Sequence, residues 1–84
     1  MNAKSVRSLA TDHDSEALAA AIEGIIEREE DVLGTGEADL AELLTNLMLA
    51  NRIRAAMDTG TSLKDAFRAE MAKVRKVVQN TPND

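Results

Sequence analysis

The longest regular pattern of apolar residues lies in the middle of the chain, at residues 37–58. Apolar side chains recur there at three- and four-residue steps, the spacing that places them on one face of an α-helix. More apolar residues lie beside this face, so one neighbouring helix could not cover them all. The sequence therefore predicts a central helix packed on at least two sides. Its face consists of Leu40, Leu43, Leu47, Ala50 and Met57, with Leu44, Met48, Leu49, Ile53, Ala55 and Ala56 beside it.

Two further helices are predicted, at residues 14–33 and 62–79. Glycine and threonine at residues 34–36 and 59–61 are typical of the turns that separate helices. Gly24, inside the first helix, predicts a point of close contact with a neighbouring segment. We therefore expect an all-α fold, an antiparallel up-down-up three-helix bundle at residues 14–79. A flexible arm would precede it at residues 1–13, and a disordered tail would follow at residues 80–84.

The composition predicts a thin hydrophobic core. The 84 residues include fourteen alanines, one phenylalanine and neither tryptophan nor tyrosine. Because alanine buries little area, such a core stabilises the fold only modestly, and we expect a homodimer to complete it. The chain has no cysteine, which excludes disulfides and thiolate metal sites. No apolar run is long enough to cross a membrane, so we expect a soluble cytoplasmic protein.

Charge is distributed unevenly along the chain, whose formal net charge is −5. Ten acidic residues and one basic residue lie in residues 14–42, whereas seven bases and three acids lie in residues 52–76. Four of the acids, which we call the acidic tip, are expected at one end of the bundle: Glu27, Glu30, Asp31 and Glu37. Two interpretations remain open. The third helix could return to the tip and neutralise it with Lys73, Arg75 and Lys76, or the tip could bind a basic partner surface.

No set of residues has the spacing of a catalytic site. The single histidine, His13, has no acidic or nucleophilic partner at usable spacing, so we predict no enzyme activity, cofactor or metal centre. Residues 31–42 resemble the calcium loop of EF-hand proteins in the placement of Asp31, Gly36, Asp39 and Glu42. An apolar residue, Leu33, occupies a position where that loop requires an oxygen ligand. Whether the loop binds a divalent cation is left open.

The first predicted hairpin resembles a known family. Paired acids are followed by Leu33, the Gly-Thr-Gly turn at residues 34–36, then Asp39, Leu40 and Leu43. This run, within residues 25–56, is similar to the first hairpin of flagellar and type III export chaperones. Those are small acidic helical proteins that hold an amphipathic helix of an export substrate. The resemblance implies an adaptor that binds a helix.

The sequence thus predicts a small acidic protein-binding module: an adaptor, a regulator or an export-chaperone-like protein. An amphipathic helix is the expected partner, held by the acidic tip and by an apolar surface of Leu47, Met48, Ile53 and Met57. The alternative is a DNA-binding transcriptional or phage or plasmid regulator. It would use residues 50–78 as a helix-turn-helix, with the bases of the third helix on the phosphates. The acidic net charge makes nucleic acid the less favoured partner.

Overall fold

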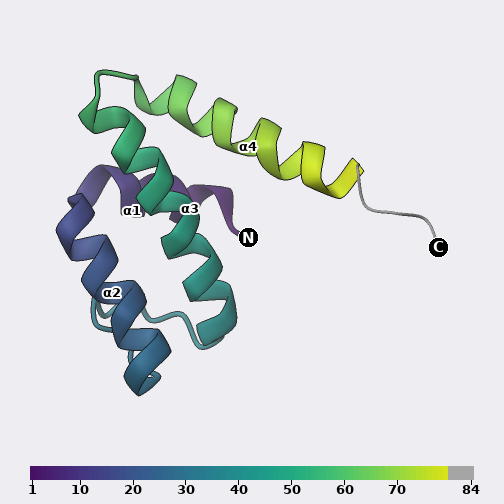
Figure 1. The fold of residues 1–84 in the computed structure, drawn as a ribbon. Coiled ribbons are helices and arrows are strands. Elements are labelled where there is room, and N and C mark those ends of the chain that lie inside the picture. The colour runs from purple at the N-terminus through teal and green to yellow at the C-terminus, as the bar shows by residue number, and fades with distance from the viewer. Residues whose placement is uncertain (80–84) are drawn as a thin grey trace.

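The computed structural model describes residues 1–79, which form four helices (Figure 1). They are α1 (Ala3–Asp12), α2 (Ser15–Arg28), α3 (Leu40–Asp58) and α4 (Leu63–Gln79). The prediction of an all-α fold is confirmed for these residues, whereas the prediction of three helices is wrong. The tail expected at residues 80–84 lies outside the described part of the chain.

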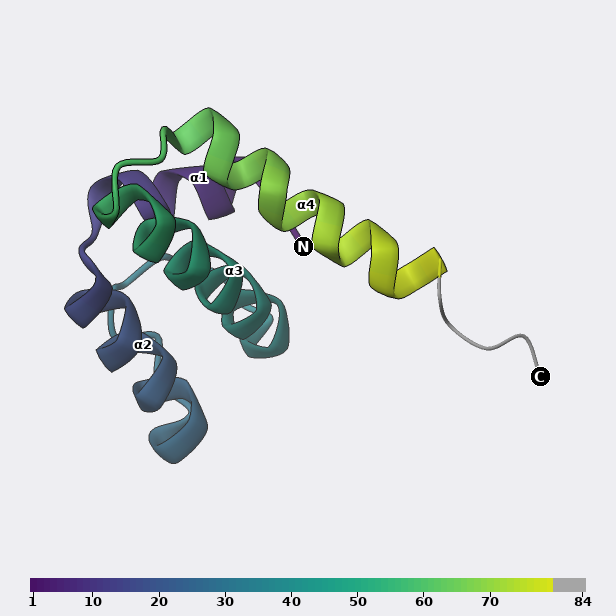
Figure 2. The ribbon, with the colours of Figure 1, turned by 45° about the horizontal axis from the view of Figure 1, so that its top comes forward.

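Helix α3 is the centre of the molecule, because α1, α2 and α4 all pack against it (Figures 1 and 2). The predicted central helix is thus present. It begins after Asp39, whose carboxylate accepts hydrogen bonds from the amides of Ala41 and Glu42. Such a cap satisfies amides that have no partner within the helix. The core around α3 contains Val6, Leu9, Ala10, Leu18, Ala21, Ile25, Leu43, Leu47, Leu49, Ala50, Ile53 and Ala66.

The first thirteen residues do not form the flexible arm that the sequence predicted. Most of them form α1, whose Val6, Leu9 and Ala10 are buried. The side chain of Asn2 caps this helix, and the Asn2 amide donates a 3.0 Å hydrogen bond to Oδ1 of Asn46 in α3. The sequence carries a signal for this helix, an Asn cap followed by apolar residues at the i, i+3 and i+4 spacing.

Helix α2 ends five residues earlier than predicted, at Arg28 rather than residue 33. Glu29 adopts the left-handed conformation, with φ of 54°. The amides of Glu29 and Glu30 then donate to the carbonyls of Ile25 and Gly24, at 3.0 and 3.2 Å. This pattern terminates a helix while satisfying its last carbonyls. The chain leaves α2 here and forms a connecting loop, residues 29–39.

The loop turns back against α2, and this contact explains the glycine inside that helix. A Cβ at Gly24 would collide with Cγ2 of Val32. Gly24 is therefore a point of close contact, as the sequence predicted, and its neighbour is the loop that follows the same helix. The left-handed residue at the end of α2 is what directs the chain into this position.

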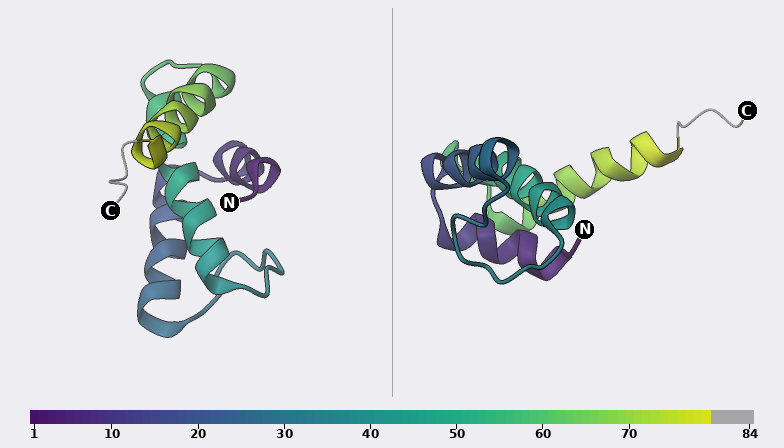
Figure 3. Two further views of the ribbon diagram at one scale, coloured as in Figure 1. Left: turned by 90° about the vertical axis from the view of Figure 1, so that its right-hand side faces the viewer. Right: turned by 90° about the horizontal axis from the view of Figure 1, so that it is seen from below.

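Helix α4 packs against α3 only along its first turns. Ser62 caps it by accepting a hydrogen bond from the Asp65 amide at 3.2 Å, and Ala66 and Glu70 are buried against the bundle. From residue 72 to residue 76 every side chain is exposed. Figures 1 and 3 show this end of α4 extending away from the other helices. The predicted up-down-up return to the acidic tip is therefore wrong. We call residues 72–79 the projecting segment.

Candidate protein-binding surface

The apolar residues predicted to bind a partner lie mostly inside the protein. Leu47 and Ile53 are each 1% exposed and belong to the core around α3. Met57 is half-buried and packs against the same core. Only Met48, 42% exposed, is presented to solvent. Leu47 and Ile53 are therefore packed among the helices that surround α3 and are not presented to a partner in this structure.

The acidic tip is divided by the loop. Glu27 and Glu30 are exposed at the end of α2, and Glu30 accepts a hydrogen bond from Arg28 at 2.8 Å. Glu37 lies instead beside α1, where it lines a cavity with Lys4. Within residues 1–79 no three acidic or histidine side chains approach closely enough to hold a metal ion together. The four acids therefore do not form a chelating cluster, and they lie on different parts of α2 and the loop.

Asp31, the remaining residue of the acidic tip, organises the loop. Its Oδ2 accepts hydrogen bonds from the Thr35 hydroxyl and the Gly36 amide, both at 2.9 Å. Burial acts to raise the pKa of the Asp31 carboxyl. The hydrogen bonds from the loop outweigh that effect and hold this pKa below its ordinary value. Oδ2 of the carboxylate that resembles the first calcium ligand is thus occupied by its own loop, whereas the buried Oδ1 has no hydrogen-bond partner among the described residues.

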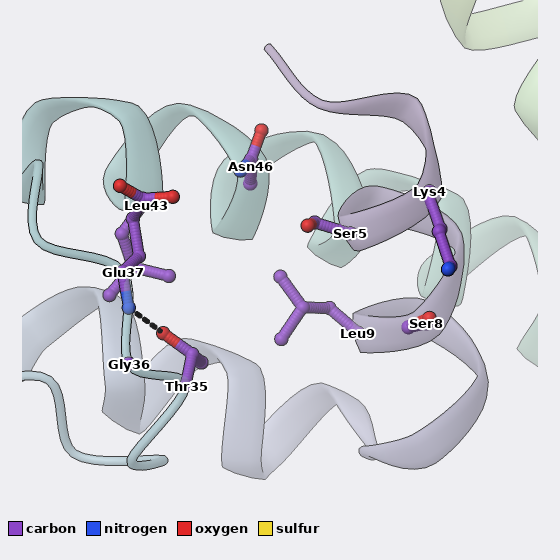
Figure 4. Close-up of a pocket in the computed structure, with 9 residues that line it drawn as sticks. All are labelled: Lys4, Ser5, Ser8, Leu9, Thr35, Gly36, Glu37, Leu43 and Asn46. Carbon is purple, nitrogen blue, oxygen red and sulfur yellow. Dashed lines mark hydrogen bonds between the residues drawn. The ribbon is translucent and has the colours of Figure 1, made fainter.

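A cavity of about 360 Å³ lies between α1, the loop and the start of α3 (Figure 4). The hydroxyl of Thr35 shapes its rim by accepting a hydrogen bond from the Glu37 amide at 3.2 Å. The lining residues are Lys4, Ser5, Ser8, Leu9, Thr35, Gly36, Glu37, Leu43 and Asn46.

Exposed apolar side chains lie on the side of α2 and α3 that is opposite to α1 and the loop. On α3, Asn46 faces α1, so Met48, about 200° further around the helix, faces away from α1. On α2, Gly24 faces the loop. Ile26 follows Gly24 by two residues, which is again about 200° around the helix, so it faces away from the loop. Figure 3 shows α1 and the loop on one side of α2 and α3. Met48 and Ile26 consequently share the opposite side.

Apolar side chains on this shared side are exposed on both helices. Ile26 is 67% exposed and Met48 42% exposed. Ile22 and Leu44 lie one helical turn before them and are half-buried. Large apolar side chains grouped in this way on the surface mark interaction sites more often than isolated ones do. We call Ile22, Ile26, Leu44 and Met48 the apolar strip.

Acidic residues border the apolar strip on α2. Glu23 lies three residues before Ile26 and Glu27 lies four residues after Glu23, so the two acids form a row along the helix. Both are exposed, and neither makes an ion pair with another residue of the described chain. Both acids help to raise the pKa of Arg28, whose own ion pair is with Glu30. Without an ion pair of their own, the two carboxylates can still accept a basic group from outside.

The projecting segment has the opposite character. The face of α4 that packs on the bundle through Ala66 and Glu70 continues into Val74, which is 37% exposed because α4 has passed beyond α3. Lys73 and Arg75 lie on either side of Val74 and are exposed. The segment is thus an amphipathic helix end with bases beside its apolar residue.

The bases of α4 do not neutralise the acidic tip within the chain. Lys73 lies 3.7 Å from Glu70 on its own helix, and Glu70 also pairs with Arg52 at 3.3 Å. Among the ion pairs of residues 1–79, none joins Lys73, Arg75 or Lys76 to residues 27–42. The interpretation of mutual neutralisation is wrong for this part of the molecule.

The fold and surface define a small all-α protein in which three helices surround a fourth. No helix among residues 1–79 has both the length and the apolarity to cross a bilayer. The family described as "Family of unknown function (DUF6952)" matches residues 1–79, and the chain belongs to that family. No curated protein and no solved structure matches the chain.

Proposed function

We propose that this protein is a small protein-binding module that acts as an adaptor, regulator or export-chaperone-like component, without catalysis. The observation that carries the proposal is the apolar strip, bordered by Glu23 and Glu27. Exposed apolar side chains with a charged rim are typical of protein interaction surfaces. The favoured partner is an amphipathic helix with bases beside its apolar face.

The resemblance to flagellar and type III export chaperones supports a helical partner. That resemblance rests on the hairpin that corresponds to α2, the loop and α3, which is also where the apolar strip lies. The binding surface proposed here differs from the one expected from sequence. It keeps Met48 and Glu27, and it replaces the buried Leu47 and Ile53 by Ile26 and Leu44.

Capture from a native lysate of the source organism tests this proposal. Wild-type protein, Ile26→Asp and Ala20→Asp are immobilised in equal amounts. Ala20 is an exposed α2 residue well away from Ile26 around the helix, so Ala20→Asp is the matched control. Wild type and the control should retain one protein in near-stoichiometric amount, either another sequence or the cell's own copies of this chain. The Ile26→Asp variant should lose it. Equal retention by all three would contradict the assignment of the surface.

DNA binding through α4 is the second candidate function. The exposed bases Lys73, Arg75 and Lys76 at the free end of α4 favour it. Measurement of binding to duplex DNA over a range of salt concentrations tests it, because contacts with phosphates weaken steeply as salt increases. A steep decrease in affinity that disappears in Arg75→Gln would support this function. Undetectable binding at low salt would exclude it.

A further inference from the structure

The projecting segment and the apolar strip have complementary chemistry. The segment presents Val74 between Lys73 and Arg75, and the strip presents Ile26 beside Glu23 and Glu27. Opposite charges around apolar contacts favour association and set its register. The chain therefore carries both halves of one helix-binding interface.

A single molecule cannot bring these two halves together. Only residues 59–62 separate α3 from α4, and α4 is held on α3 by the buried Ala66 and by the ion pair of Glu70 with Arg52. Figure 1 shows that this placement directs the projecting segment away from α2. The segment would have to leave its place on α3 to reach the strip of its own chain.

A second copy removes this conflict. We propose that two copies of the chain form a closed dimer in which the projecting segment of each docks on the apolar strip of the other. Val74 would contact Ile26 and Met48, while Lys73 and Arg75 would approach Glu23 and Glu27. Each copy supplies one projecting segment and one apolar strip, so a two-fold symmetric dimer leaves no segment and no strip without a partner. This inference rests on the proposed function, because it identifies the helix bound on the apolar strip as the projecting segment of a second copy.

Paired charge reversals provide the test, with the full chain and with sedimentation equilibrium as the readout. The base-reversed variant is Lys73→Glu with Arg75→Glu, and the acid-reversed variant is Glu23→Lys with Glu27→Lys. Each variant alone places like charges on both sides of the interface, and its dimer should weaken by about tenfold or more. In an equimolar mixture, each segment again meets a strip of opposite charge, and the dimer should return.

Attraction between opposite net charges cannot explain the return of the dimer in the mixture. The wild-type charge of −5 falls by four to −9 in the base-reversed variant and rises by four to −1 in the acid-reversed variant, so both remain negative. Lys64→Glu with Arg68→Glu is the matched control, because it makes the same change at two exposed bases near the start of α4. Circular dichroism of each variant checks that it remains helical.

The proposal predicts that wild type and the control dimerise equally well, that each reversed variant dimerises more weakly, and that the mixture regains the dimer. It is overturned if wild type is monomeric at all concentrations, if either reversal leaves the dimer intact, or if the mixture stays monomeric. A wild type that stays monomeric, together with lysate capture of a different protein through Ile26, would overturn this inference and leave the proposed function standing. An Ile26→Asp variant that dimerises normally would contradict the use of the strip.

Discussion

Helix α1 and the projecting segment of α4 are both amphipathic, but the bundle covers only α1. The 10 residues of α1 bury Val6 and Ala10 completely against the rest of the core. The 17 residues of α4 pack against the bundle as far as Met71 and leave Val74 at the surface. A short helix can thus be a structural element while the end of a longer one is free for binding. The apolar face alone does not show which role it has; the path of the neighbouring helices decides.

Truncation of one apolar side chain in each region should give the largest difference. Leu9→Ala should lower the free energy of unfolding by about 2–5 kcal/mol, because it leaves a cavity in the core. Val74→Ala should change it by less than about 0.5 kcal/mol in dilute protein, because Val74 is partly solvated. Urea unfolding followed by circular dichroism measures both. Equal losses would mean that α1 and the segment are equally packed.

The attachment of α1 to α3 can be broken separately from its apolar contacts. Asn46→Ala removes the acceptor of the Asn2 amide and should cost about 1–3 kcal/mol of unfolding free energy. Asn51→Ala is the matched control on α3, since the Asn51 side chain makes no hydrogen bond with other residues of the described chain. The control should remain close to wild type. A loss of the same size in both variants would show that the buried hydrogen bond is not the cause.

Relief of backbone strain at the end of α2 should stabilise the protein. Glu29→Gly removes the cost of a left-handed non-glycine residue, so the unfolding free energy should rise by about 1 kcal/mol. For a domain of this size that corresponds to an increase of about 4–8 °C in Tm. Scanning calorimetry measures it. Glu30→Gly, at the next position, has no such strain to relieve and should not raise Tm.

The smallest effect concerns the loop and depends on pH. The pKa of Asp31 is lower in the folded state than its ordinary value of 3.8, so its ionised form favours folding. This contribution is complete above the ordinary pKa and is lost as the pH falls through the folded-state pKa. Urea midpoints of wild type and Asp31→Asn should therefore differ at neutral pH and converge in acid. A difference that is constant with pH would contradict the role of the carboxylate.

Much of the fold could be predicted from local patterns. The end of α3 at Asp58, the turn around Gly60 and the Ser62 cap all follow from residues whose conformational preferences are strong. Helix α1 was missed although its signal is present, because ten residues form no stable helix in isolation and depend on packing against α3. Its anchor, Asn46, lies far along the chain and cannot be recognised from local sequence.

The remaining errors have tertiary causes. The end of α2 depends on Glu29, a residue type that seldom marks a left-handed position, and on the contact of Val32 with Gly24. The apolar stripe of α4 predicts which side of that helix packs, but the direction of the helix across α3 is set by its contacts. For the same reason the sequence identified Met48 and Glu27 as surface residues but could not distinguish them from Leu47 and Ile53, which the bundle covers.

Amide hydrogen exchange as a function of protein concentration is the most direct test of this account. The amides of Arg7–Asp12 in α1 should be strongly protected at every concentration, because that helix belongs to the core. Amides of residues 72–76 and of residues 22–26 should exchange faster in dilute solution and become protected together as the dimer forms. Rapid exchange of α1 in all samples, or a projecting segment as protected as α1 in dilute solution, would contradict it.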